Sequence, residues 1–130
     1  MKTLYVKGVV FSGKREAAKY LELSWVKKQI IQKFGFVPYS GTLNIKMINE
    51  CCLRFREMSK KAEAIVISPE EGFWSGRCYR AYLRNNVNCV VVIPEASSYP
   101  ENVIELVAPL NLREKLCLKD GDVVDLSIAL

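Results

Sequence analysis

The chain has 130 residues, of which 50% are hydrophobic and 25% are charged, so it is long enough for one globular domain with its own core. It contains no histidine, which excludes a Ser-His-Asp or Cys-His nucleophile and a histidine general base. The net charge of +5 is uneven, because residues 1–65 carry a net +8 and residues 66–130 a net −3. A basic half favours an anionic partner, either nucleotide phosphates or nucleic acid, although a solvated basic surface would have the same composition.

The five cysteines are odd in number and lack the spacing of a metal site, so we expect them to be reduced and mostly buried. The N-terminal residues lack the long apolar stretch of a signal peptide, and no apolar run reaches the length of a membrane span. These features predict a cytoplasmic protein without membrane association. We expect a single domain over residues 1–130 and a monomer.

Runs of β-branched, aromatic and other apolar residues predict short strands in chain order at residues 3–11, 20–23, 42–48, 64–67, 78–83, 89–93 and 123–130. Residues 14–19 are expected to form a charged loop or one helical turn. A helix is predicted from Ser24, its N-cap, to a stop at Gly35. Turns are expected at residues 85–86 and 119–122.

Two further short helices are expected. One lies within residues 97–107, and the other covers residues 112–116 with Asn111 and Glu114 as a capping pair. Many short strands separated by turns, with one convincing helix, predict a mainly β fold. The expected architecture is a small closed β-barrel with one or two short helices.

Three polar segments beside the predicted strands are candidates for chemistry. In the first, Thr42 and Asn44 are two residues apart, so on a strand both side chains point to the same face, together with Lys46. A hydroxyl and an amide oxygen are hard neutral ligands that suit Mg²⁺ with water and phosphate as the other ligands. Solvent-facing polar side chains on a strand would give the same pattern.

The second segment holds Glu105 in an otherwise apolar run, where it is either a helix-surface charge or an inward-pointing acceptor for a polar ligand. The third covers residues 109–114, where backbone amides at the start of a short helix and Arg113 suit an anion or a polar base. A capped helix with a surface arginine explains the third segment equally well. The usual nucleotide-binding folds are not indicated, because the chain has neither a GxxxxGK[ST] motif nor a GxGxxG motif.

The chain resembles the archaeal CTP-dependent riboflavin kinase family in two blocks, "GFVPYSGTLNIKM" at residues 35–47 and "VVVIPEASSYPENVIELVAPLNLREKLCLKDGDVV" at residues 90–124. The resemblance extends from residue 8 to the last strand. It implies a cradle-loop type of barrel and transfer of the γ-phosphate of CTP to the 5′-hydroxyl of riboflavin, with Mg²⁺ as cofactor. The implied partners are therefore riboflavin and FMN, with CTP and CDP.

The resemblance also implies roles for individual residues. It assigns Thr42 and Asn44 as magnesium ligands, Ser97 to the place of a threonine that touches the FMN phosphate, and Glu105 to a flavin-contacting glutamate. The segment that holds the cytidine nucleotide corresponds to Leu110, Asn111, Leu112 and Arg113. No catalytic base is identified, and Glu105 is the nearest candidate by elimination.

One loop departs from the family pattern, which has Ser-Gly-x-Gly-x-Gly after the first strand. The corresponding nucleotide-binding residues here are Gly13, Lys14, Arg15, Glu16, Ala17 and Ala18, so that Arg15 and Ala17 replace two glycines. Those glycines let backbone amides approach a phosphate closely. Their loss could weaken nucleotide binding or alter the choice of nucleotide. Alternatively, Lys14, Arg15 and Lys19 could supply the positive charge through their side chains.

Two alternatives to a kinase stay open at this point. A barrel that binds a flavin or a nucleotide without turnover is supported only by the altered loop. A small nucleic-acid-binding barrel would suit the net +8 half, but no basic helix with interleaved aromatic residues is present. Nucleic acid is therefore not the expected partner.

Overall fold

The structure, a computed structural model, describes residues 2–13, 16–84 and 87–130, except for the side chain of Glu16. The described part contains seven strands and four helices. The strands are β1 (Thr3–Phe11), β2 (Leu43–Met47), β3 (Ile65–Ile67), β4 (Gly76–Leu83), β5 (Val87–Pro94), β6 (Val103–Val107) and β7 (Val123–Ala129). The helices are α1 (Glu16–Leu21), α2 (Ser24–Phe34), α3 (Asn49–Lys61) and α4 (Leu112–Lys115).

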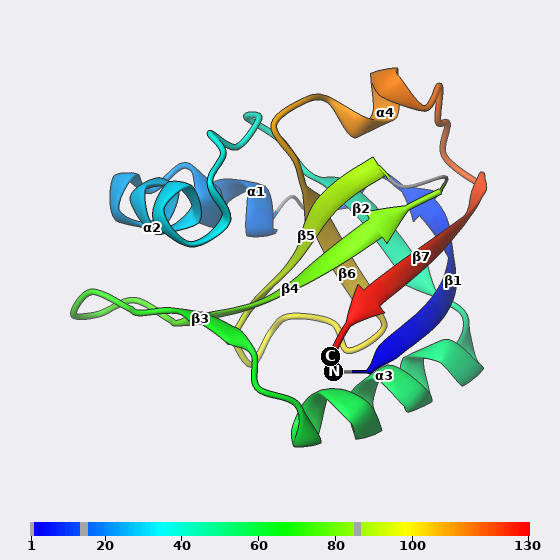
Figure 1. Cartoon of the computed structure of the whole chain (residues 1–130), viewed down its shortest axis with the longest axis horizontal. Helices are drawn as coiled ribbons and strands as arrows, with labels where there is room; N and C mark the ends of the chain where they lie inside the picture. Colours follow the sequence, from blue (N-terminus) through cyan, green and yellow to red (C-terminus); the bar gives the residue numbers. More distant parts are fainter. Residues whose placement is uncertain (1, 14–15, 85–86) are drawn as a thin grey trace.

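All the strands pair antiparallel, and the sheet closes on itself in the order β4-β5-β6-β2-β1-β7, with β7 pairing back to β4 (Figure 1). Strand β3 adds to the first residues of β4, while β7 pairs with the last residues of β4. The predicted mainly β fold with a small closed barrel is confirmed.

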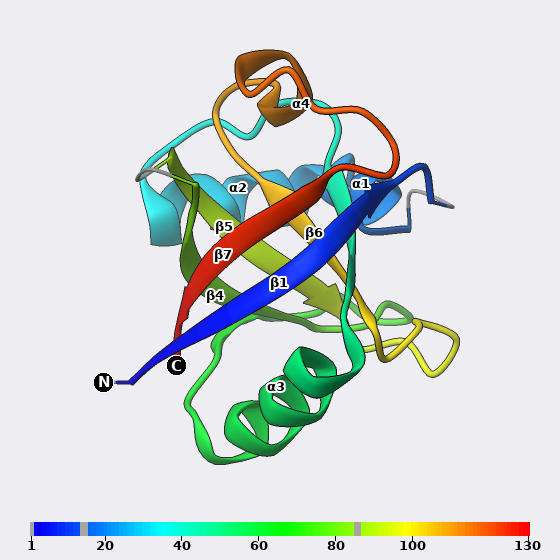
Figure 2. The same cartoon turned by 90° about the vertical axis from the view of Figure 1, so that its right-hand side faces the viewer.

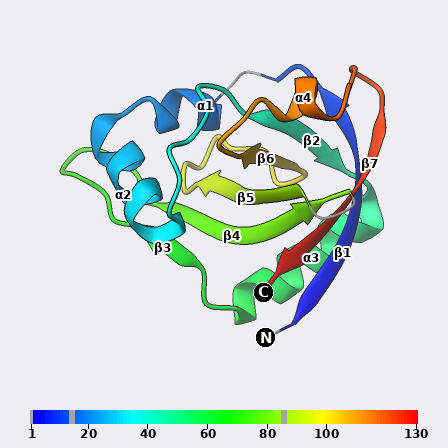
Figure 3. The same cartoon turned by 45° about the horizontal axis from the view of Figure 1, so that its top comes forward.

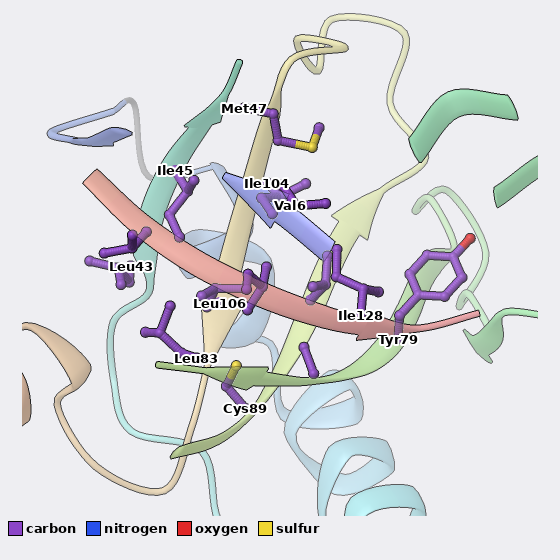
Figure 4. Packing of buried hydrophobic residues seen from close by; sticks show 14 of the residues in the cluster. Val6, Leu43, Ile45, Met47, Tyr79, Leu83, Cys89, Ile104, Leu106 and Ile128 are labelled. Carbon is purple, nitrogen blue, oxygen red and sulfur yellow. The ribbon is translucent and has the colours of Figure 1, made fainter. Parts of the chain in front are cut away.

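Apolar side chains from alternate strand positions fill the interior of the barrel. Figure 4 shows Ile45 of β2, Ile104 and Leu106 of β6 and Ile128 of β7 gathered in this core. The closure of the barrel leaves these side chains almost no contact with water, and apolar burial of this kind is the main favourable term in folding.

The two ends of the barrel are covered by different helices. Helix α3 lies across one end and contributes Cys51, Cys52 and Phe55 to the core, whereas α4 lies at the other end and contributes Leu112 (Figures 1 and 2). Helix α3 is not among the expected elements. Its buried residues form a stripe on one face of an otherwise polar helix, and the two cysteines do not stand out as apolar positions.

Helices α1 and α2 lie together outside the barrel wall (Figure 3). They form a second core, in which Ala17, Tyr20 and Leu21 of α1 and Val26 and Ile30 of α2 pack with residues of β3, β4, β5 and β6. The predicted strand at residues 20–23 is wrong. Ala17, Tyr20 and Leu21 are spaced i, i+3 and i+4, so a helix can bury all three on one face.

The predicted helix within residues 97–107 is also wrong, because residues 103–107 form strand β6. Every residue of β6 is buried. A strand that is buried on both faces lacks the alternation of apolar and polar residues that identifies an exposed strand.

The ends of the other predicted helices are largely confirmed. Gly35 ends α2 in the left-handed conformation with φ 79°, and the side chain of Asn111 caps α4 by accepting a hydrogen bond from the amide of Glu114 at 3.2 Å. Ser24 is the first residue of α2 rather than its N-cap, a position held by Leu23. The turn expected at residues 85–86 lies outside the described residues.

The cysteines are unpaired, and Cys51, Cys52, Cys78 and Cys89 are buried, as expected. Burial raises the pKa of the Cys78 and Cys89 thiols to about 12, so both behave as small apolar side chains. Within the described ranges, no helix combines the length and the apolar composition needed to cross a lipid bilayer.

Candidate active site

Strand β2 presents two chemically different faces. Leu43, Ile45 and Met47 point into the barrel core, as Figure 4 shows. The alternation of the strand therefore directs Asn44 and Lys46 to the outer face. Thr42 precedes the strand and points the same way, because its hydroxyl meets an outward-facing side chain of β6. The expected shared face is confirmed.

Glu105 of β6 is the residue that Thr42 contacts, and it lies opposite Asn44 in the β2–β6 pairing. Its side chain is 1% exposed and accepts three hydrogen bonds. Oε1 accepts from Oγ1 of Thr42 at 2.5 Å, and Oε2 accepts from the amide of Ala17 at 2.9 Å and from the hydroxyl of Tyr99 at 2.9 Å. Glu105 therefore ties together the start of β2, helix α1 and the loop between β5 and β6.

The alternative that Glu105 is a helix-surface charge is wrong. A buried carboxylate is destabilising unless donors compensate for its lost hydration. Here three of its roughly four acceptor positions are used by protein groups. Glu105 is thus a buried acceptor on the outer face of the barrel, and in this structure its hydrogen-bond donors are protein groups.

A hollow of about 410 Å³ opens beside this carboxylate and is called here the β6 hollow. It is lined by Phe11, Ser12, Gly13, Asn44, Lys46, Tyr99, Pro100, Asn102, Val103 and Glu105. The side chains of Phe11 and Tyr99 give it aromatic walls. Its volume falls in the range of small-molecule sites in proteins.

A second hollow, called the α4 hollow, has a volume of about 260 Å³. It is lined by Tyr39, Ser40, Gly41, Thr42, Leu43, Leu106, Ala108, Leu110, Asn111, Leu112 and Arg113. Thr42 lines the α4 hollow and Asn44 lines the β6 hollow. The polar pair therefore stands between two cavities, one of which contains the whole predicted nucleotide segment at residues 110–113.

Hydrogen bonds hold the walls of the α4 hollow. Nδ2 of Asn111 donates to the hydroxyl of Tyr39 at 3.2 Å, and the amide of Tyr39 donates to the carbonyl of Ala108 at 2.8 Å. Arg113 pairs with Asp120 at 2.9 Å, and Asp120 also accepts from the hydroxyl of Ser12 at 2.8 Å. The hydrogen bond from Ser12 lowers the pKa of the Asp120 carboxyl most, and the hydrogen bond from Arg113 lowers it further.

The predicted nucleotide-binding loop is divided between two environments. Gly13 lines the β6 hollow, and a Cβ added there would lie 2.7 Å from Oδ1 of Asn44. Ala17 and Ala18 are buried, and Ala17 belongs to the second core. Lys14, Arg15 and the side chain of Glu16 lie outside the described residues.

Ser97 is exposed in the turn that follows β5, and among the described residues it lines neither hollow. The same loop instead sends Tyr99 and Pro100 to the β6 hollow. Phe11 and Tyr99 also line the β6 hollow, and no local pattern in the sequence marks either of them as a site residue. Spacing alone could have identified Lys46 as a site residue, since it lies on the same strand face as Thr42 and Asn44.

The chain matches one protein-family model and is similar to several known proteins. Residues 10–128 match the family model CTP-dep_RFKase, described as "Domain of unknown function DUF120". The riboflavin kinase of Sulfurisphaera tokodaii is 33% identical over 133 residues, which cover 99% of this chain and 98% of that protein.

Two other relatives are longer than this chain. The riboflavin kinase of Archaeoglobus fulgidus is 35% identical over 98% of this chain and 56% of that protein. The riboflavin kinase of Pyrobaculum aerophilum is 39% identical over 95% of this chain and 60% of that protein. The chain thus spans less than two thirds of the length of these two relatives.

Proposed function

The chain belongs to the CTP-dependent riboflavin kinase family, and we propose that it transfers the γ-phosphate of CTP to the 5′-hydroxyl of riboflavin. The observation that carries this proposal is the position of Thr42, Asn44 and Glu105 between two hollows of about 260 and 410 Å³. Phosphoryl transfer needs two substrates whose reacting atoms meet. Two neighbouring cavities with a polar group between them suit that requirement.

In this reaction the bond between the γ-phosphorus and the β,γ-bridging oxygen breaks, and the 5′-oxygen of riboflavin forms a new bond to the phosphorus. The hydroxyl proton passes to solvent, and the products are FMN and CDP. A loose transition state needs little covalent help, so the protein contributes mainly positioning and neutralisation of charge.

We propose Thr42 and Asn44 as the residues that hold Mg²⁺. The hydroxyl of Thr42 uses its hydrogen in the bond to Glu105, which leaves the oxygen lone pairs free for a cation. The side chain of Asn44 is 7% exposed, lines the β6 hollow and makes no hydrogen bond to the described residues. The two neutral oxygen donors fit a hard cation, and a bound Mg²⁺ would offset the charge of the phosphate oxygens.

The nucleotide is assigned to the α4 hollow and the flavin to the β6 hollow. Leu110, Asn111, Leu112 and Arg113 all line the α4 hollow, and they match the family segment for cytidine. The β6 hollow offers the rings of Phe11 and Tyr99 for contact with a flat isoalloxazine, together with Glu105. Because Ser97 lies outside this lining, its contact with the FMN phosphate would require the 95–102 loop to move.

The simplest test is to incubate the purified protein with riboflavin, Mg²⁺ and either CTP or ATP, and to separate the flavins by chromatography. FMN formation with CTP, abolished by a chelator of Mg²⁺, is the expected result. FMN formation only with ATP would mean that the altered loop has redirected nucleotide choice. No FMN from folded protein with any nucleotide would refute the kinase assignment.

We also propose that the protein acts as a cytoplasmic monomer without a nucleic-acid or membrane partner. Closure of the barrel supports the monomer, because an exposed strand edge is what pairs with a second chain. In the described part of the chain, the end of the sheet is the short strand β3. The substrates support the location, since CTP is available in the cytoplasm. Light scattering of the purified protein checks the oligomeric state.

A further inference from the structure

We infer that Lys46 is the side chain that neutralises the phosphoryl group while it is transferred. This inference rests on the proposed kinase function and adds a residue to it. Lys46 lies two positions beyond Asn44 on the outer face of β2, so its side chain emerges on the same face as the proposed magnesium ligands. It lines the β6 hollow together with Gly13 and Glu105.

An aromatic contact holds the ammonium group at the hollow. Nζ of Lys46 lies over the ring of Phe11, 5.3 Å from its centroid, and Phe11 lines the same hollow. Phe11 is also the pairing partner of Asn44 across β1 and β2. A cation over an aromatic face is attracted by the ring quadrupole but keeps its hydrogen-bond donors for another group.

Among the residues that the structure describes, no carboxylate forms an ion pair with Lys46. Of the described residues that line the two hollows, Arg113 is the other basic one, and it forms an ion pair with Asp120. Glu105 is the one carboxylate among the described residues that line the β6 hollow, and protein donors already occupy both of its oxygens. An anion entering this hollow would therefore meet Lys46 as an available cation.

The altered loop makes this charge more important in this chain. In the structure the amide of Ala17 donates to Glu105, and the Ala17 side chain is buried in the second core. That amide is therefore not available to a phosphate while α1 is packed in this way. A side chain from the rigid strand β2 can supply positive charge without the backbone amides that a glycine-rich loop would present.

The transferred group is the γ-phosphate of CTP before the reaction and the phosphate of FMN after it. Lys46 should therefore affect both the rate of transfer and the affinity for FMN, but not the affinity for riboflavin, which has no phosphate. This difference between two flavins separates a phosphate contact from a general effect on the pocket.

The test compares the wild type with Lys46→Met, Lys46→Arg and the control Lys7→Met. Lys7 is an exposed lysine on the neighbouring strand β1, where it faces Asp125 at 3.9 Å and lines neither hollow. We expect Lys46→Met to lower kcat about 100-fold, the effect of removing one charge-stabilising donor, with KM for riboflavin nearly unchanged. Lys46→Arg should recover much of the loss, and Lys7→Met should behave as the wild type.

A binding measurement without turnover completes the test. Titration followed by flavin fluorescence should show FMN affinity about tenfold weaker in Lys46→Met, with riboflavin affinity unchanged. If the wild type makes FMN but Lys46→Met has wild-type kcat and FMN affinity, the inference about Lys46 is wrong and the kinase function stands. An equal loss of affinity for FMN and for riboflavin would also overturn the inference, because that result would indicate a structural role for Lys46. A wild type that makes no FMN would refute the proposed function itself.

Discussion

The outer surface of β5 packs against α1 and α2 through apolar side chains, whereas the outer surface of β2 and β6 is covered by polar contacts that converge on Glu105. In the first region Val90 and Val92 belong to the same buried apolar cluster as Ile30. In the second region hydrogen bonds from Thr42, Ala17 and Tyr99 reach one carboxylate.

This difference between the two outer surfaces indicates that the apolar one mainly stabilises the barrel and the polar one mainly forms the candidate site. Apolar packing is insensitive to direction and stabilises in proportion to buried area. Hydrogen bonds to a buried carboxylate are directional, so they hold side chains at chosen places and leave the two hollows open beside them. Helix α1 belongs to both regions, since Ala17 has its side chain in the second core and its amide on Glu105.

The largest expected effect comes from the polar region. Asn44→Ala removes a proposed magnesium ligand, and we expect FMN formation to fall about 10²–10³-fold, with the free energy of unfolding changed by less than about 1 kcal/mol. Steady-state kinetics and urea unfolding check the two values. Asn88→Ala, an exposed asparagine on β5, is the matched control and should retain full activity. Wild-type turnover by Asn44→Ala would remove Asn44 from the metal site.

The next prediction contrasts the two regions directly. Ile30→Ala leaves a cavity in the second core and should lower the free energy of unfolding by about 2–5 kcal/mol, while the folded fraction keeps its activity. Glu105→Gln should lower the free energy of unfolding by about 1–3 kcal/mol, because the single amide oxygen cannot accept from all three donors. It should also lower activity. Urea unfolding and an assay normalised to folded protein measure both. A Glu105→Gln protein with full activity would contradict the idea that the polar region serves function while the second core serves stability.

A smaller effect is expected at Gly13. In Gly13→Ala the new methyl group would lie 2.7 Å from Oδ1 of Asn44 and 3.1 Å from Cε2 of Phe11, so the carboxamide has to move. We expect activity to fall about tenfold, which corresponds to 1.4 kcal/mol of transition-state stabilisation, with little change in KM for CTP. Gly72→Ala is a useful comparison, because Gly72 has no neighbour within 4 Å but has φ 85°, so it should affect stability rather than turnover.

The smallest effect concerns Asp120 at the edge of the polar region. Its pKa is lowered by the hydrogen bonds from Ser12 and Arg113, so the folded state favours the charged form. The stabilisation is present above the ordinary carboxyl pKa and is lost as the pH falls through the lowered value. Unfolding measured at several pH values should show that Asp120→Asn is less stable than the wild type near neutral pH. The two proteins should converge in acid, and a constant difference at every pH would contradict this origin.

Local spacing in the sequence was sufficient for several parts of the molecule. The alternation from Thr42 to Met47 predicted which side chains of β2 face the core and which face the site, since a strand has a period of two residues. Gly35 and Asn111 predicted the end of α2 and the cap of α4, because both signals act within one turn of helix. The closed barrel followed from many short strands separated by turns.

Only the tertiary structure decided the remaining parts. Strand β6 is buried on both faces and so shows no alternation, and α1 is helical because Ala17, Tyr20 and Leu21 meet α2 and β5 on one side. The role of Glu105 depends on donors 88, 63 and 6 residues away along the chain, which no local pattern connects. The sequence by itself thus determined the chemistry available on each strand face, and long-range packing decided which of those groups meet.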